Sequence, residues 1–298
     1  MQSIAVWTLL GASILWGMTW LPLKYLHQLG FDGILITLWV YLLMFALAMP
    51  FVWRYRAYIT PHWKPLLGVM LLGGGAQLAF NTSMIYGDVI RAMVLFYLIP
   101  LWGVLGGRIF LGELITPIRA LGMVLSVFGA FLVVGGFDAF ESPPTWIDAL
   151  AIASGFLFAM NNITFRASTE TPVMLKVPFM FLGAVLFSTL VVIAMQEPLM
   201  PSVSVDAWWI LFAYAAIWMM LANLATQWAV TKMESGKSSI ILILELVTAV
   251  VSASLILGET MSFWEMVGGG FILLAAMLET VPQNTGKERT KMNNLGAL

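Results

Sequence analysis

The chain alternates between long apolar segments and short polar connections. Charged residues, prolines and glycines divide it into ten apolar stretches, each about 20 residues long, which is the length a helix needs to cross a hydrocarbon core of about 30 Å. The ten predicted spans are residues 3–25, 33–53, 62–86, 89–110, 117–136, 146–166, 172–195, 206–231, 236–257 and 262–280. The pattern therefore predicts an all-α integral membrane protein with ten transmembrane helices.

Local chemistry supports several of the helix starts. Thr145 with Asp148, and Ser262 with Glu265, have the spacing of capping boxes. A capping threonine also precedes a proline suited to a first helical turn at residues 60–61, 116–117 and 171–172. The first apolar run lacks a basic segment before it and a small-residue cleavage site after it, so we expect an uncleaved span.

Composition agrees with a membrane protein. The chain is 61% hydrophobic and 10% charged, against about 25% charged residues in soluble domains. A net charge of −1 gives no basis for nucleic-acid binding. The chain has no cysteine and only two histidines, His27 and His62, so we expect no metal site and no catalytic residues.

Lysine and arginine are distributed unevenly between the two ends of the predicted helices. With the N-terminus inside, the twelve on the cytoplasmic side are Arg54, Arg56, Lys64, Arg108, Arg119, Arg166, Lys176, Lys232, Lys237, Lys287, Arg289 and Lys291. Only Lys24 and Arg91 lie on the other side. Positive residues favour cytoplasmic loops, so this bias predicts that both termini are cytoplasmic. Residues 281–298 are polar and lack periodicity, and we expect a disordered tail there.

Two stretches of the chain match at a constant spacing. LWGVLGGRIFLGE ends at Glu113 and VTAVVSASLILGE ends at Glu259, an offset of 146 residues. The same offset aligns two pairs of amides, each spaced i, i+4: Gln77 and Asn81 with Asn223 and Gln227. The alternative is chance similarity between apolar helices.

A repeat unit of five spans must enter the membrane from opposite sides in its two copies. We therefore predict two inverted five-helix repeats, residues 1–140 and 141–280. Inverted repeats are a construction of many secondary transporters, with the substrate held near the midplane between the halves.

Together these features resemble the drug/metabolite transporter superfamily in its ten-span form, built from two EamA-type repeats. The residues that carry the resemblance are LWGMTW at 15–20, Pro100, and the Leu-Gly-Glu ends at Glu113 and Glu259. Within the superfamily the chain is most similar to the YddG-type exporters of aromatic and other neutral amino acids. The resemblance implies a carrier of the bacterial inner membrane, not an enzyme. It also implies a central cavity lined by the first, third, fourth, sixth, eighth and ninth spans.

A cavity for an aromatic amino acid needs apolar walls and a few hydrogen-bonding groups. The candidates are polar and aromatic residues within the spans: Trp16, Thr19, Trp20, Gln77, Asn81, Tyr97, Asn161, Asn162, Asn223 and Gln227. The alternative for the amides is structural bonding across helices. The alternative for the tryptophans is a lipid-facing or interfacial position.

Backbone flexibility is concentrated in the fourth span. Pro100 removes one bond of the helical ladder and frees the carbonyl of the fourth preceding residue, while Gly103, Gly106 and Gly107 lower resistance to bending. We predict a kink or hinge there. The matching position of the second half is Leu246, so the two halves need not bend alike.

One carboxylate lies inside a predicted span. Glu245 interrupts the apolar stretch ILILELVTAVVSASLIL, and an intramembrane carboxylate is a functional hypothesis by default. Two roles remain open for it: binding the substrate ammonium, or coupling export to proton uptake. The alternative is a structural carboxyl that fixes the ninth helix to its neighbours.

The leading hypothesis is secondary-active export of aromatic and other neutral amino acids, such as methionine, by alternating access. The alternatives are an efflux carrier for drugs or other small metabolites and, more remotely, a passive facilitator or channel. The chain has no phosphate-binding G-x-x-x-x-G-K-[ST] loop, so the driving force must come from a gradient. The expected partners are a small-molecule substrate, the lipid bilayer and a coupling proton, with no cofactor.

Overall fold

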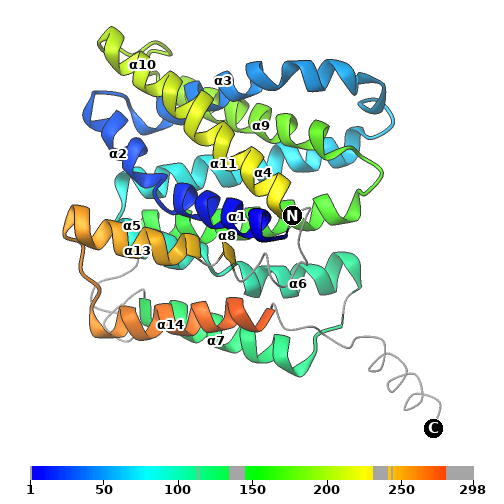
Figure 1. Ribbon diagram of the computed structural model, residues 1–298, viewed down its shortest axis with the longest axis vertical. Coiled ribbons are helices and arrows are strands. Elements are labelled where there is room, and N and C mark those ends of the chain that lie inside the picture. Colours follow the sequence, from blue (N-terminus) through cyan, green and yellow to red (C-terminus); the bar gives the residue numbers. More distant parts are fainter. Residues whose placement is uncertain (1, 113, 134–144, 231–240, 243, 280–298) are drawn as a thin grey trace.

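The computed structural model describes residues 2–112, 114–133, 145–230, 241–242 and 244–279 (Figure 1), and within these ranges it contains helices and no strand. In chain order the helices are α1 (Gln2–Gly17), α2 (Trp20–Gln28), α3 (Gly33–Arg54), η1 (Arg56–Tyr58), α4 (Trp63–Tyr86), α5 (Val89–Phe96), α6 (Ile99–Leu111), α7 (Pro117–Val133), α8 (Trp146–Ala167), α9 (Val173–Ala194), α10 (Val205–Ala213), the π-helical segment η3 (Tyr214–Met219), α11 (Met220–Val230), α13 (Leu244–Leu257) and α14 (Phe263–Glu279).

Within the residues that the structure describes, every predicted span contains helix, and three of the spans are not continuous α-helices. The first consists of α1 and α2, and the fourth of α5 and α6. In the eighth span the π-helical segment η3 joins α10 to α11. The all-helical architecture is confirmed, and the three irregular spans are a feature that the apolar pattern did not reveal.

Six helical segments are long and apolar enough to cross a bilayer. They are Ile4–Gln28, Gly33–Arg54, Val89–Leu111, Trp146–Ala167, Val173–Ala194 and Val205–Thr226. The apolar helices α7, α13 and α14 are shorter. α4 has 24 residues, but its second half carries Gln77, Asn81, Thr82 and Ser83, which make it less apolar than the six.

The helix starts test the predicted caps directly. Thr145 and Asp148 form a reciprocal capping box at α8, and Ser262 and Glu265 do the same at α14. Thr116 accepts a bond from the Arg119 N–H at the start of α7. The predictions for the other two threonine–proline pairs were wrong. α4 and α9 begin after His62 and Pro172, and neither helix start has a side-chain cap.

Helices from the two halves of the chain are interleaved. α4 lies against α8 and α9, and α9 also contacts α3. α1 contacts α11 and α13, whereas α2 contacts mainly α3 and α4, so the main neighbours change at the interruption of the first span. α7 and α14 form a separate pair at the lower edge of Figure 1.

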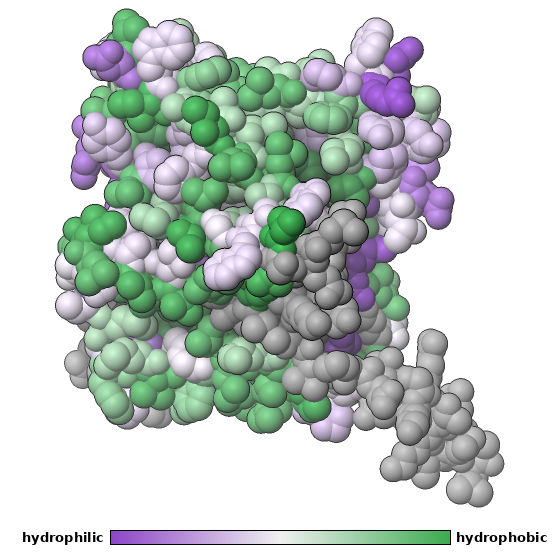
Figure 2. Space-filling view, viewed as in Figure 1, coloured by the Kyte–Doolittle hydropathy of each residue, from purple (hydrophilic) through white to green (hydrophobic). Residues whose placement is uncertain are grey.

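The surface has the distribution expected for a protein surrounded by lipid. Apolar side chains cover most of the visible face in Figure 2, and hydrophilic residues gather towards the ends of the helices. Large apolar side chains such as Trp7, Val124 and Leu255 are more than 60% exposed. Such exposure is costly in water and costs nothing in hydrocarbon.

Candidate functional site

The first span is interrupted at Met18 and Thr19. The Thr19 N–H bonds the Trp16 carbonyl at 3.1 Å, and the Leu21 N–H bonds the Met18 carbonyl at 3.0 Å. Both are i to i−3 bonds, so the helix tightens for one turn. Pro22 has no N–H and cannot bond the Met18 carbonyl in the α-helical manner, which accounts for the interruption.

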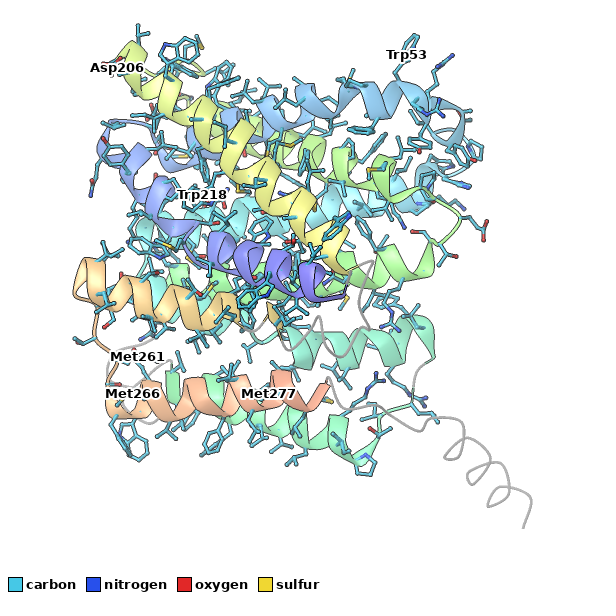
Figure 3. All side chains as sticks on the ribbon, in the orientation of Figure 1. Trp53, Asp206, Trp218, Met261, Met266 and Met277 are labelled. Carbon is cyan, nitrogen blue, oxygen red and sulfur yellow. The ribbon has the colours of Figure 1, made fainter. Side chains whose placement is uncertain are left out.

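Because the Thr19 N–H bonds the Trp16 carbonyl, the Leu15 carbonyl accepts hydrogen bonds from side chains instead. It accepts the Thr19 hydroxyl and the Trp218 indole N–H, both at 3.1 Å. Trp218 belongs to η3, and Figure 3 shows it where the eighth span passes close to the first. A backbone group of the first half is therefore satisfied by a side chain of the second half.

Two further tryptophans tie the first span to the second half. The Trp16 indole donates to the Thr226 hydroxyl at 3.1 Å, and the Trp20 indole donates to the Ser252 hydroxyl at 3.0 Å. Trp20 is only 2% exposed, so the lipid-facing alternative does not apply to it. Both rings lie at the interruption of the first span, between the two halves.

The fourth span is interrupted at Tyr97 and Leu98, between α5 and α6. Because Pro100 has no backbone N–H, it cannot donate a hydrogen bond to the Phe96 carbonyl. This carbonyl instead faces Gly155 of α8, where a Cβ atom would collide with it. The helix is interrupted just before the proline, and the predicted kink or hinge at Pro100 stays a prediction.

The three glycines of the predicted hinge have different surroundings. A Cβ atom at Gly103 would have nothing within 4 Å, whereas at Gly106 it would collide with Met160 and Ile163 of α8. Gly107 is buried. A side chain at Gly106 would therefore require Met160 and Ile163 to move, and Gly103 is free of that constraint.

Glu245 lies where the two interrupted spans meet. It is the second residue of α13, and Gly17 at the end of α1 packs directly against its backbone carbonyl. Its side chain lies within hydrogen-bonding reach of the Tyr97 hydroxyl, at the interruption of the fourth span. That hydroxyl is also 3.3 Å from the Leu242 carbonyl. The two half-helix junctions and the intramembrane carboxylate thus form one site.

The matched amides of the two halves have different partners. Gln77 accepts the Tyr41 hydroxyl at 2.6 Å, and Asn81 donates to the Thr37 hydroxyl at 3.2 Å, so both bridge α4 to α3. Asn223 donates to the Met219 carbonyl, at the end of η3, at 2.8 Å. The Gln227 side chain lies outside the part that the structure describes.

The two asparagines of the sixth span are placed differently. Asn161 is 3% exposed, and its Oδ1 atom has no hydrogen-bond partner among the described residues. This atom faces Gly73 of α4. Asn162 is exposed. Asn161 is therefore the one whose amide lies inside the helix bundle.

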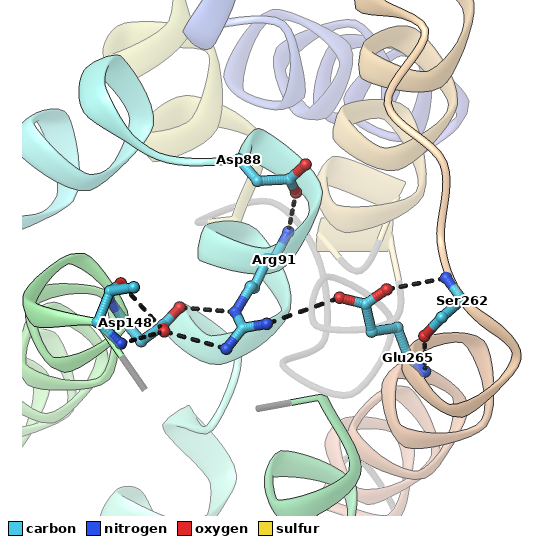
Figure 4. Close-up of polar contacts among 6 residues, drawn as sticks. Asp88, Arg91, Asp148, Ser262 and Glu265 are labelled. Atoms are coloured by element: carbon cyan, nitrogen blue, oxygen red, sulfur yellow. Dashed lines mark hydrogen bonds and ion pairs between the residues drawn. The ribbon is translucent and has the colours of Figure 1, made fainter. Parts of the chain in front are cut away.

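An ionic network connects three helix starts near one end of the bundle (Figure 4). Arg91 on α5 makes two bonds to Asp148 on α8, at 2.7 and 3.0 Å, and its guanidinium lies 3.9 Å from Glu265 on α14. Asp88 caps the Arg91 N–H at 2.8 Å. Two charged side chains in bidentate contact form the stronger kind of hydrogen bond.

A second carboxylate lies at the N-terminus of α5. Glu259 follows α13 and accepts the N–H groups of Val89 and Ile90 at 3.2 and 3.1 Å. Burial raises the pKa of Glu259 above its ordinary value, and repulsion from Asp88 adds to this, while the two N–H groups and Lys24 oppose it. Glu259, the last residue of the second Leu-Gly-Glu motif, therefore caps the N-terminus of α5 from a distant part of the chain.

Sequence reasoning missed several residues of these networks. Tyr41, Trp218 and Asp148 took no part in the expected site. Their signal was weak, because the partner of a tyrosine, an indole or a carboxylate at a helix end is set by packing between distant segments. Among the described residues, no group of three or more histidines or acidic residues could hold a metal ion.

Interrupted helices that meet beside a carboxylate, in a bundle of apolar helices, are typical of polytopic membrane transporters. The chain belongs to the EamA-like transporter family, whose sequence pattern matches residues 3–135 and again residues 145–280. It is therefore a membrane transporter of small molecules built from two copies of one unit.

A solved crystal structure of a protein has a similar fold. It is 17% identical, covers 94% of this chain and 98% of its own, and superposes with a TM-score of 0.58. At this identity the likeness concerns the fold alone. A comparison with curated proteins gave no match.

Proposed function

We propose that this transporter exports amino acids, aromatic ones and other neutral ones, across the bacterial inner membrane by alternating access. The observation that carries the proposal is the position of Glu245 at the junction of the two interrupted spans. Half-helix ends at mid-depth present backbone groups to a polar ligand, and such junctions form substrate and ion sites in secondary transporters.

The chemistry around the junction suits an amino acid. Glu245 is an anionic partner for an ammonium group, and Trp16, Trp20 and Tyr97 supply aromatic surface for cation–π contact and stacking. Apolar walls with a few convergent polar groups are typical of small-molecule sites. The ligand class that matches is a small zwitterion with an apolar side chain.

Glu245 also has the contacts that proton coupling requires. In its charged form the carboxylate accepts the Tyr97 O–H. In its neutral form it can donate to Tyr97, whose O–H then turns to the Leu242 carbonyl at 3.3 Å. Both protonation states of Glu245 thus find hydrogen bonds, so we propose that it exchanges a proton during the transport cycle.

Transport in proteoliposomes tests this proposal. Wild-type protein should exchange labelled phenylalanine in a saturable manner, and an imposed pH gradient should drive its accumulation. Glu245→Gln keeps the size of the side chain and removes its charge, so pH-driven accumulation should be lost. Glu170→Gln removes an exposed carboxyl and serves as the matched control.

Other outcomes identify the alternatives. Full transport with unchanged pH dependence in Glu245→Gln would leave only a structural role for this residue. If amino acids are ignored and lipophilic cations are moved, the protein is a drug efflux carrier. Flux that does not saturate would indicate a passive facilitator or channel.

A further inference from the structure

One buried hydroxyl of the eighth span lacks a partner. Tyr214 is 4% exposed, and its hydroxyl oxygen is buried without a hydrogen bond to any described residue. Buried polar groups in proteins are nearly always hydrogen-bonded, and in a membrane the surrounding lipid offers no substitute. An unpaired hydroxyl at such a place is therefore a cost in stability that calls for an explanation.

The polar groups of the neighbouring cluster on α3 and α4 are engaged with one another. Tyr41 on α3 lies within electrostatic range of Tyr214. It donates its own proton to the Gln77 Oε1 atom at 2.6 Å and also interacts with the Asn81 amide, which donates to Thr37 at 3.2 Å. Tyr214 thus stands at the border of a hydrogen-bonded cluster without belonging to it.

The backbone places Tyr214 there in an unusual way. It is the first residue of the six-residue π-helical segment η3, which contacts α3. Short π-helical segments inside α-helices are rare and occur frequently at functional sites. Trp218, four residues later in the segment, bonds the Leu15 carbonyl at the interruption of the first span. The π-helical segment therefore connects the tyrosine cluster to the site described above.

Two groups in and beside this cluster can donate hydrogen bonds to a ligand. Its own hydroxyl can donate, and because the Gln77 Oε1 atom is taken by Tyr41, the Gln77 amide offers its N–H groups. Gln77 is only half-buried. The cluster of Thr37, Tyr41, Gln77, Asn81 and Tyr214 contains no acidic side chain. Donors without a carboxylate favour an oxygen acceptor, and above all an anionic one.

We propose that Tyr214 and Gln77 form the site that binds the carboxylate of the substrate, with the Tyr214 hydroxyl as the donor. The inference rests on the proposed export of amino acids and adds a division of labour to it. The carboxylate binds at the tyrosine cluster, and Glu245, which would repel it, receives the ammonium. Leu15, which bonds Trp218, and Gly17, which contacts Glu245, lie two residues apart on α1 and link the two places.

Binding to purified protein in nanodiscs, followed by tryptophan fluorescence, tests the inference with two ligands. Phenylalanine carries both charged groups, and phenethylamine lacks the carboxylate. Tyr214→Phe should weaken phenylalanine binding about 10- to 100-fold, as expected for the loss of a hydrogen bond to a charged group. Its affinity for phenethylamine should stay at the wild-type value.

Thermal unfolding without ligand supplies an independent readout. Tyr214→Phe removes a buried hydroxyl that has no partner, so its melting temperature should equal or exceed that of wild type. Tyr41→Phe is the matched control: it removes an engaged hydroxyl from the same cluster and should lower the melting temperature.

Three results would overturn the inference alone. They are unchanged phenylalanine affinity in Tyr214→Phe, an equal loss of affinity for both ligands, and a lowered melting temperature with unchanged affinity, which would mean a structural hydroxyl. A wild-type protein that binds neither ligand would overturn the proposed function, and this inference with it.

Discussion

The third and eighth predicted spans occupy matching places in the two halves, yet they contact their neighbours in different ways. α4 lies against α8 and α9, whereas η3 and α11 lie against α3 and α1. The offset that aligns Gln77 with Asn223 makes these two sets of contacts counterparts. The chain therefore contains two versions of one interface.

The α4 interface is built from backbone contacts. A Cβ atom at Gly74 would collide with the Gly183 backbone, and one at Gly183 would collide with the Met70 carbonyl. Gly73 faces Met180 in the same close manner. Small residues that let helix backbones touch are the usual means of close helix packing in membranes.

The α11 interface is built from side chains. Trp16 reaches Thr226, and Trp218 reaches the Leu15 carbonyl, each through a single indole bond. Gly11 on α1 has nothing within 4 Å of the place where its Cβ would lie. Here the contacts include separate hydrogen bonds made by large side chains.

The difference shows that the two halves do not have the same conformation. A close backbone interface has little freedom to rearrange, whereas single hydrogen bonds between side chains can be exchanged one at a time. Alternating access by two related halves requires that they differ at any moment. The α11 interface is therefore the one that we expect to rearrange first in the proposed transport cycle.

The largest effect is expected at the glycine interface. Gly183→Ala forces a methyl group into the Met70 carbonyl, so α4 and α9 must separate, at a cost of about 3 kcal/mol or more. Gly11→Ala adds the same methyl group where there is space and, because alanine favours a helix over glycine, should leave the melting temperature unchanged or raise it slightly. Thermal unfolding of the purified proteins checks both. Equal behaviour of the two variants would contradict the contrast between the interfaces.

A smaller effect is expected at the bonds made by tryptophans. Trp20→Phe removes the indole N–H that donates to Ser252 at 3.0 Å and also shrinks a ring that is only 2% exposed, so part of the loss comes from packing. We expect the hydrogen bond itself to contribute about 1 kcal/mol, the usual size between membrane helices. Ser252→Ala and the double variant complete a thermodynamic cycle. A coupling near zero would mean that this contact between the halves adds nothing to stability.

The helices could be predicted from the sequence because their signal is local. About twenty apolar residues between charged loops predict a span wherever they occur. The capping boxes at Thr145 and Ser262 were also predicted correctly, because they depend only on residues three positions apart. The interruption at Pro22 was also within reach, since a proline inside an apolar run predicts a broken ladder. It was missed because the run was treated as one span.

The arrangement of the site could not be predicted in the same way. Glu245 was recognised as a candidate, but its contact with Tyr97 joins residues far apart in the chain and depends on how α5 and α13 cross. The π-helical segment has no compositional signal, so the sequence does not indicate towards which neighbouring helix the side chains of Tyr214 and Trp218 point. The sequence supplied the residue types, and packing decided which of them meet.

The smallest effect is expected at Glu259, which joins the second half to the start of α5 outside both interfaces. Burial raises its pKa in the folded protein, so the folded state binds the proton more tightly than the unfolded chain. Its contribution to stability is complete below the unfolded pKa of about 4.3 and is lost as the pH rises through the folded value. The melting temperature of wild type should therefore rise on acidification from neutral pH towards about pH 4.5.

Glu259→Gln should lack this part of the pH dependence, while Glu197→Gln, which alters an exposed carboxyl, should retain it. The difference between the two melting curves isolates the contribution of Glu259 from that of other titrating groups. If the melting temperature of Glu259→Gln equals that of wild type at every pH, burial does not raise the pKa of Glu259 in the folded protein. The connection between the halves at α5 would then rest on Arg91 and Asp148, whose bidentate contact does not require a proton.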